Sequence, residues 1–263
     1  MIRPALPRWV AVPATAAAVF LAVPLLAMLA RVPWARLPAV LAAPAAIDAL
    51  LLSLGTCLLS TLVCLVLGLP LAMVLARGRG NWAAVGRTLA TIPMVLPPVV
   101  AGLALLIALG RRSWLGGWLG SVGVDLAFTT GAVVVAQTFV AMPYLVVSVE
   151  GALRSAQDDF AVVAASLGAS PTTVLRRVTL PLVAPSVASG AALAFARALG
   201  EFGATLTFAG SLQGTTRTLP LEIYLQREAD TDTAIALSVV LITLAAALVG
   251  ATARFARGQG QLS

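Results

Sequence analysis

The sequence contains neither histidine nor lysine, and its seventeen basic residues are all arginines. Without lysine the chain cannot form a Walker A phosphate loop or a lysine Schiff base, and without histidine it cannot form a histidine metal site. Charge is scarce as well, because only 10% of the residues are charged, against roughly 25% in soluble domains. These absences exclude a soluble domain and most classes of enzyme, and we expect no catalytic residue and no metal site.

Cysteine is limited to Cys57 and Cys64, which lie seven residues apart in one apolar stretch. On a helix this spacing places both side chains on one face, about 10 Å apart along the axis, which is too far for a disulfide. We interpret both as small buried hydrophobic residues.

Hydrophobic residues are abundant instead, at 60% of the 263 residues. A bilayer core takes about 20 apolar residues as a helix, and windows of that length recur along the chain. We predict an all-α polytopic membrane protein, a single domain over 1–263, with about six transmembrane helices. The predicted spans are 10–30, 47–76, 89–109, 129–149, 182–205 and 234–253. The second would be about 45 Å long as a straight helix, so it must tilt, break or protrude. The first exceeds the apolar core of a signal peptide and is expected to be retained.

Arginines are distributed unequally between the two sides that these spans define. With the N-terminus inside, ten arginines fall on the cytoplasmic side and six on the outer side, while Arg197 lies within a span. Because arginine-rich loops stay in the cytoplasm, both termini are predicted to be cytoplasmic. The dispersal of the arginines between spans also indicates that the net charge of +7 reflects membrane topology, and no nucleic-acid partner is expected.

The loop 150–181 interrupts the hydrophobic pattern on the predicted cytoplasmic side. Phe160, Val163 and Leu167 share one helical face, and Gly168 is placed to end that helix in the left-handed conformation. Ser170 and Pro171 follow as the cap and first residue of a second helix, which Pro181 is expected to stop. Such short helices are marginal in water, so this elbow is expected to need a partner.

The elbow resembles the "EAA" loop of ABC importer permeases. Val162-Val163-Ala164, three further residues, Gly168, nine further residues, Val178, Thr179 and Leu180-Pro181 match that pattern in spacing, with valine at Val162 where the family has glutamate. The resemblance implies the type I importer fold and a coupling loop that sits in a groove of an ATPase subunit. The residues that it assigns to coupling are Phe160, Val162, Val163, Ala164, Leu167, Gly168, Val174, Val178, Leu180 and Pro181.

Three further stretches, 93–102, 197–205 and 217–224, resemble the molybdate-type branch of these permeases. The resemblance implies a subunit in the bacterial inner membrane that imports an oxyanion, with molybdate as the leading substrate. Sulfate, thiosulfate and tungstate remain alternatives, because sulfate permeases share a Gly-Glu-Phe-Gly element and tungstate is nearly isosteric with molybdate. The implied partners are two copies of an ABC ATPase, which would hold ATP and Mg, a periplasmic or lipid-anchored oxyanion-binding protein, a second copy of this chain and the bilayer. No cofactor is expected on this chain.

Candidates for the translocation path or its gate are Pro97, Pro98, Arg197 and Glu201. The prolines forbid a regular helix, which is tolerated at membrane depth where protein or a water-filled cavity covers the break. They could equally mark the start of a span at the interface. Arg197 and Glu201 are i, i+4 neighbours near the outer leaflet, either as part of a gate or as a structural ion pair.

A stand-alone secondary anion transporter is the principal rival from another class. It would need internal repeats or carboxylates buried in the middle of its spans. Neither is present, since Glu201 falls near the end of a predicted span. A membrane-anchored enzyme is a second rival, and it lacks any catalytic constellation.

Overall fold

The computed structural model describes residues 7–155 and 159–259, which form helices and connecting turns without a β-strand. This confirms the all-α prediction. In chain order the elements are η1 (Arg8–Val10), α1 (Ala11–Ala30), α2 (Leu37–Ala42), α3 (Pro44–Val63), η2 (Cys64–Gly68), α4 (Leu69–Arg77), α5 (Asn81–Val95), α6 (Pro98–Leu109), α7 (Trp114–Ser121), α8 (Thr130–Ser155), α9 (Asp159–Ser166), α10 (Pro171–Val174), η3 (Leu175–Thr179), α11 (Leu180–Leu199), α12 (Gly203–Ala209), α13 (Leu219–Ala229) and α14 (Thr231–Gln259).

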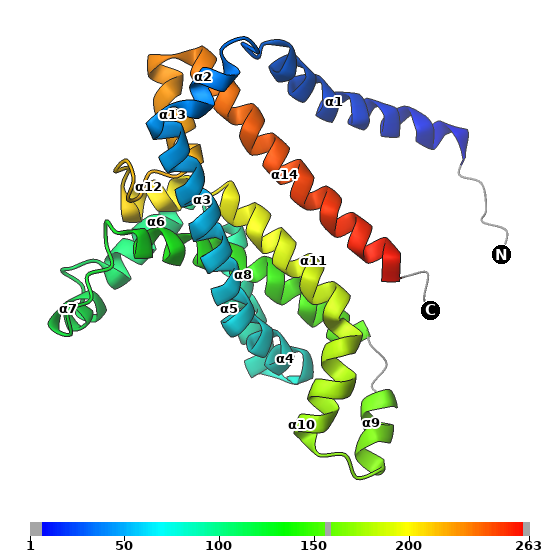
Figure 1. The fold of residues 1–263 in the computed structure, drawn as a ribbon. Coiled ribbons are helices and arrows are strands. Elements are labelled where there is room, and N and C mark those ends of the chain that lie inside the picture. The colour runs from blue at the N-terminus through cyan, green and yellow to red at the C-terminus, as the bar shows by residue number, and fades with distance from the viewer. Residues whose placement is uncertain (1–6, 156–158, 260–263) are drawn as a thin grey trace.

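Five helical segments are long and apolar enough to cross a membrane, and the bent pair α5–α6 is a sixth candidate. Helix α8 forms the centre of the bundle, where it contacts α3, α4, α5, α11 and α12. Of its most apolar window 67% is buried, whereas the corresponding window of α1 is wholly unburied. Figure 1 shows α1 standing apart from the bundle, beyond α14. The core therefore surrounds α8, and α1 contributes no buried residue to it.

Small residues allow α11 to pack closely on α8. Gly190, Ala194 and Ala198 are buried at four-residue spacing, and a Cβ on Gly190 would lie 3.0 Å from the Cβ of Ser148 on α8. The sequence left open whether this small-residue face packs within one subunit or between copies. In the structure it packs within the subunit. Cys57 and Cys64 are buried in the same core, as predicted.

Two widened turns explain how long helices accommodate prolines. Residues Cys64–Gly68 and Leu175–Thr179 form π-helical turns, and Pro70 and Pro181 each follow two residues later. A π turn frees a carbonyl from its usual i+4 partner, which suits a residue that has no N–H. The second span is therefore one helical segment of 34 residues, Pro44–Arg77. The prediction that Pro181 stops the second elbow helix was wrong, because helix Pro171–Leu199 continues through it.

The predicted third span is not a straight helix. Helices α5 and α6 meet at Leu96 and Pro97 with a bend of 117°. Since α5 already begins at Asn81, the prolines interrupt the apolar segment and do not mark its start. Pro98 is nevertheless the first residue of α6, and the assignment of this break to a translocation path stays a prediction.

The predicted fifth span ends earlier than expected, at Leu199. Gly200 leaves the helix, and a new short helix, α12, begins at Gly203. The Oε1 atom of Glu201 accepts a hydrogen bond from the Ala204 backbone N–H at 2.8 Å, which satisfies one of the free donors at the start of α12. Glu201 therefore marks a helix boundary that hydropathy does not detect.

Candidate functional site

The elbow consists of α9 and α10, joined by a sharp turn at one end of the bundle (Figure 1). Gly168 has a φ of +84°, as predicted, and its N–H donates to the Ala165 carbonyl. The Ser170 hydroxyl accepts a hydrogen bond from the Thr173 N–H, and Pro171 occupies the first helical position. The sequence therefore specifies this turn residue by residue.

The elbow exposes a continuous apolar surface. Phe160, Val162, Val163 and Leu167 are between 57% and 83% exposed. Val174 differs from expectation: it is only 8% exposed and cannot belong to the exposed ridge. The other predicted coupling residues are partly buried, at Ala164, Val178 and Leu180, or exposed, at Gly168 and Pro181. The exposed apolar surface of the elbow is thus carried mainly by α9 and the turn that follows it.

A second cluster forms where stretches 93–102 and 197–205 meet, although about a hundred residues separate them in sequence. Helix α6 packs on α12 through two glycines. A Cβ on Gly203 would lie 2.7 Å from the Cβ of Pro98, and one on Gly102 would lie 2.8 Å from the Ala204 carbonyl oxygen. These distances are too short for any side chain, so glycine is required at both positions. We call this contact the α6–α12 junction.

Glu201 links the junction to the end of α11. Its side chain is 1% exposed, and its Oε2 lies 2.7 Å from the Nη2 of Arg197, whose side chain is 26% exposed. The same carboxylate caps α12 through Ala204. One buried carboxylate therefore fixes both a partly exposed guanidinium and the start of a helix. Pro97 and Pro98 are exposed beside it, so the four gate candidates belong to one region of the fold.

Stretch 217–224 joins the same region. The Phe202 ring lies 5.0 Å from the Tyr224 ring, centroid to centroid. Arg217 pairs with the buried Glu222 at 3.3 Å, and it also donates to Ser211 in the loop after α12. Sequence reasoning missed the hydrogen bond from the Leu219 N–H to the Ser53 hydroxyl at 2.7 Å, which anchors α13 to α3. That contact joins segments far apart in the chain, so no local sequence pattern indicates it.

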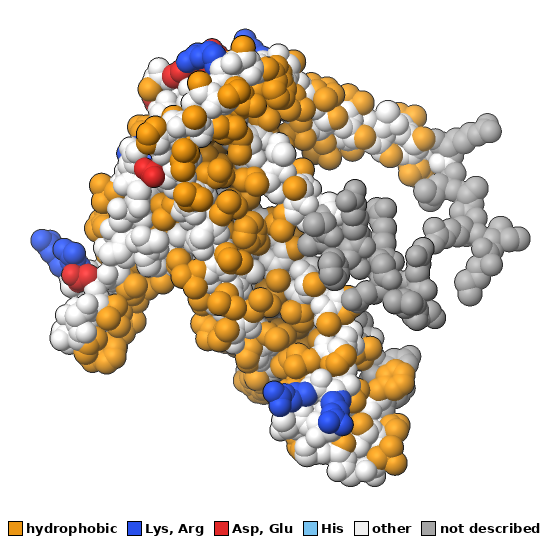
Figure 2. Space-filling view, in the orientation of Figure 1, with side chains coloured by type: hydrophobic (Ala, Val, Ile, Leu, Met, Phe, Trp, Pro, Cys, Tyr) orange, Lys and Arg blue, Asp and Glu red, His pale blue; other side chains and the backbone are white. Residues whose placement is uncertain are grey.

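Charges gather at the end of the bundle that carries α2 and α13, as Figure 2 shows. Arg36 pairs with Asp230 at 3.1 Å and with Asp232 at 3.2 Å. The pKa of Asp230 is lowered, first by the hydrogen bond from the Thr233 hydroxyl and further by Arg36. Among the described residues no group of histidine, cysteine, aspartate and glutamate side chains is arranged to hold a metal ion.

Comparison with known proteins relates this arrangement to transport. Residues 68–257 match the family model "Binding-protein-dependent transport system inner membrane component". The molybdenum transport system permease protein ModB of Mycobacterium tuberculosis is 58% identical over 244 residues, covering 93% of this chain and 92% of that protein. ModB of Escherichia coli is 38% identical over 178 residues, covering 67% and 78%. A probable sulfate transport system permease protein of Nephroselmis olivacea is 33% identical over 186 residues, covering 71% and 66%.

Solved structures share the fold at low sequence identity. A bacterial alginate ABC transporter in complex with its alginate-bound periplasmic protein aligns with a TM-score of 0.74 at 16% identity, over 95% of this chain and 93% of that one. The inward-facing MetNI methionine ABC transporter aligns with a TM-score of 0.64 at 18% identity, over 81% and 94%. The fold is that of type I ABC importer permeases. The chain therefore belongs to the family of binding-protein-dependent transport system inner membrane components, within its molybdate-type branch.

Proposed function

We propose that this multi-pass inner-membrane permease imports molybdate. The observation that carries the proposal is the convergence of stretches 93–102, 197–205 and 217–224 in one region around Glu201, in a chain 58% identical to a molybdenum permease. No permanent oxyanion site is needed, because permeation requires only weak and transient binding. Tungstate is expected to compete, since the two tetrahedral dianions are nearly isosteric.

The partners that complete the transporter are an ABC ATPase and an oxyanion-binding protein. ATP and Mg would be bound by the ATPase and not by this chain. Each copy carries one elbow, so two copies of the permease would engage two ATPases. The translocation path would then follow the dimer axis.

The elbow serves as the coupling element in this proposal. Its exposed apolar side chains, Phe160, Val162, Val163 and Leu167, match the need of a short helix for a docking groove. Val162 stands where the family has glutamate, so the contact between the elbow and the ATPase would be apolar at this position. Val178 and Pro181 lie on the continuous helix that joins the elbow to α11. In this proposal, that helix transmits a movement of the elbow in the ATPase groove to the α6–α12 junction.

The junction serves as the gate region. Pro97 and Pro98 break the α5–α6 backbone, and Arg197 presents a partly exposed guanidinium beside the break. Glu201 holds that guanidinium in place, which leaves its remaining donors free to meet a passing dianion. Arg197 is therefore the residue that we assign to transient anion contact, with Glu201 as its positioning residue.

The substrate is tested by deleting the gene from its host and measuring uptake. We expect high-affinity molybdate uptake to be abolished and sulfate uptake to be unchanged. Restoration of molybdate uptake by the plasmid-borne gene is the control. Loss of sulfate uptake with normal molybdenum accumulation would move the chain to the sulfate branch.

A further inference from the structure

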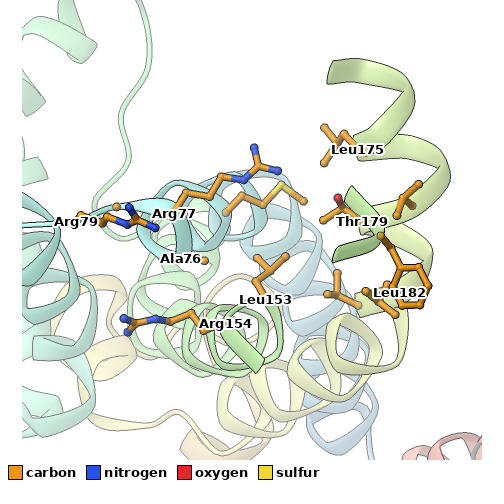
Figure 3. Close-up of a pocket in the computed structure, with 13 residues that line it drawn as sticks. Ala76, Arg77, Arg79, Leu153, Arg154, Leu175, Thr179 and Leu182 are labelled. Carbon is orange, nitrogen blue, oxygen red and sulfur yellow. The ribbon is translucent and has the colours of Figure 1, made fainter. Parts of the chain in front are cut away.

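A cavity of about 510 Å³ lies between the elbow and the ends of α4 and α8. Figure 3 shows Arg77 and Arg79 on one wall, Arg154 on a second wall, and the helix that carries Leu175 and Leu182 facing them. Arg77 and Arg79 lie at the end of α4 and Arg154 lies in the last turn of α8, and the fold brings them to one cavity. None of them was assigned a role by the resemblance to importer permeases.

The cavity is rich in positive charge. The carboxylate of Glu150 forms its short ion pair with Arg87 and lies 3.7 Å from Arg154. Among the described side chains, Arg77 and Arg79 form no ion pair. Of the three arginines that line the cavity, only Arg154 lies near a described carboxylate, so the site favours an anionic ligand.

Arg87 also fixes the turn that presents the two cavity arginines. Its Nη2 donates to the carbonyl oxygens of Leu75 at 2.6 Å and Gly78 at 3.2 Å. These bonds satisfy the carboxyl end of α4, from which Arg77 and Arg79 extend. The backbone of the turn that carries Arg77 and Arg79 is thus held by a partly buried hydrogen-bond network, while the two side chains themselves are exposed.

The remaining lining is largely apolar, from Met73, Ala76, Leu153, Phe160, Leu175, Val178, Leu182 and Val183. Figure 3 also shows that the guanidinium groups stand apart and do not converge on one point. A single small dianion would contact one arginine at a time. A phospholipid headgroup with more than one phosphate can contact more than one arginine, and its acyl chains match the apolar walls. Basic pockets between helices at the cytoplasmic side bind such headgroups.

We propose that this cavity binds an anionic phospholipid, with phosphate groups on Arg77, Arg79 and Arg154 and acyl chains on the apolar walls. The bound lipid bridges the elbow to α4 and α8 and so holds the elbow at a fixed angle to the bundle. The binding site stands independently, whereas its effect on coupling rests on the proposed function of the elbow.

Binding is tested on the purified permease in neutral detergent, by titrating cardiolipin and counting retained lipid by native mass spectrometry. The double variant Arg77→Gln/Arg79→Gln is expected to weaken binding roughly thirtyfold, because each basic side chain near an anionic headgroup contributes about a factor of five. Arg77→Lys/Arg79→Lys should retain most of the affinity. Arg176→Gln/Arg177→Gln is the matched control, since these exposed arginines lie in η3, directly after the elbow, but do not line the cavity.

Three outcomes would overturn the site. The first is equal weakening by the control pair, which would indicate general attraction to basic surface. The second is unchanged cardiolipin binding in Arg77→Gln/Arg79→Gln. The third is displacement of cardiolipin by inorganic phosphate or molybdate at comparable concentration, which would indicate a site for free oxyanions.

The coupling effect is tested in the full complex, in phosphatidylcholine nanodiscs with or without cardiolipin. We expect cardiolipin to increase ATP hydrolysis stimulated by the loaded binding protein in the wild type and not in Arg77→Gln/Arg79→Gln. Cardiolipin binding without any effect on hydrolysis would contradict the role of the lipid in coupling and leave the binding site intact. Failure of the elbow to contact the ATPase would instead appear as loss of assembly in elbow variants.

Discussion

At the scale of single residues, Gly168 is needed for its backbone conformation and not for close packing. Its φ is +84°, and nothing lies within 4 Å of a Cβ placed there, so a substitution meets no steric clash. The penalty for a side chain is then conformational, about 1–2 kcal/mol for an ordinary residue and greater for a β-branched one. The angle between α9 and α10 therefore depends on this one residue.

We expect Gly168→Val to leave the protein inserted and dimeric but to abolish transport and reduce stimulated ATP hydrolysis. Gly168→Ala should be milder, and Gly168→Asn milder still, because asparagine tolerates the left-handed conformation. Assembly, hydrolysis and uptake are measured in purified complexes in lipid. Wild-type uptake in Gly168→Val would show that this turn is not the coupling element.

The buried carboxylate of Glu201 makes two interactions, so a suitable substitution should remove one and keep the other. In Glu201→Gln the bond from Ala204 can persist while the charge pair with Arg197 is lost, at a cost of roughly 3 kcal/mol. Arg197→Gln should cost a similar amount. The double variant should lower the unfolding temperature in detergent by less than the sum of the two, since the partners are directly coupled. Strictly additive effects would show that Arg197 and Glu201 do not stabilise the protein as a pair.

At the scale of elements, the α6–α12 junction depends on close backbone approach. Gly203→Ala would place its Cβ 2.7 Å from a ring carbon of Pro98, and Gly102→Ala would crowd the Ala204 carbonyl. We expect each to destabilise the protein by about 1–3 kcal/mol and to impair uptake. Gly55→Ala is the matched control, because nothing lies within 4 Å of its Cβ, and it should be neutral or slightly stabilising. Equal unfolding temperatures for all three variants would contradict the junction.

At the scale of the whole molecule, the arrangement of arginines predicts which ends face the cytoplasm. Arg77, Arg79 and Arg154 line one cavity beside the elbow, while Arg36, Asp230 and Asp232 meet at the opposite end of α14 from Gln259. Loops assigned to the same side by counting arginines are therefore also neighbours in space. This agreement supports the proposed topology, with the elbow inside and segment 214–232 outside.

Single cysteines at Arg79, Arg176 and Glu228 test that topology in a background with Cys57→Ala and Cys64→Ala. All three positions are exposed. A membrane-impermeant thiol reagent applied to intact cells should label Glu228→Cys only, and permeabilised cells should label all three. The reverse pattern would invert the topology and with it the assignment of the elbow to the ATPase side.

The sequence alone determined the features that depend on local order and composition. The apolar spans, the exposed elbow face, the left-handed Gly168 and the Ser170 cap follow from hydropathy and from short-range backbone preferences. The continuation of the helix through Pro181 was not predictable in this way, because the π turn that accommodates the proline depends on how a long helix packs. The burial of Val174 was missed because periodicity does not say which face a neighbouring element covers.

The tertiary structure alone decided which distant segments meet. The contact of Gly102 and Gly203 at the α6–α12 junction, the packing of Gly190 on α8 and the collection of Arg77, Arg79 and Arg154 around one cavity all join residues from separate helices. A single sequence carries no measure of such distances, because hydrophobic burial is non-directional and many helix pairings satisfy the same pattern. Close backbone approach selects among them, since only glycine and other small residues permit it at these particular positions.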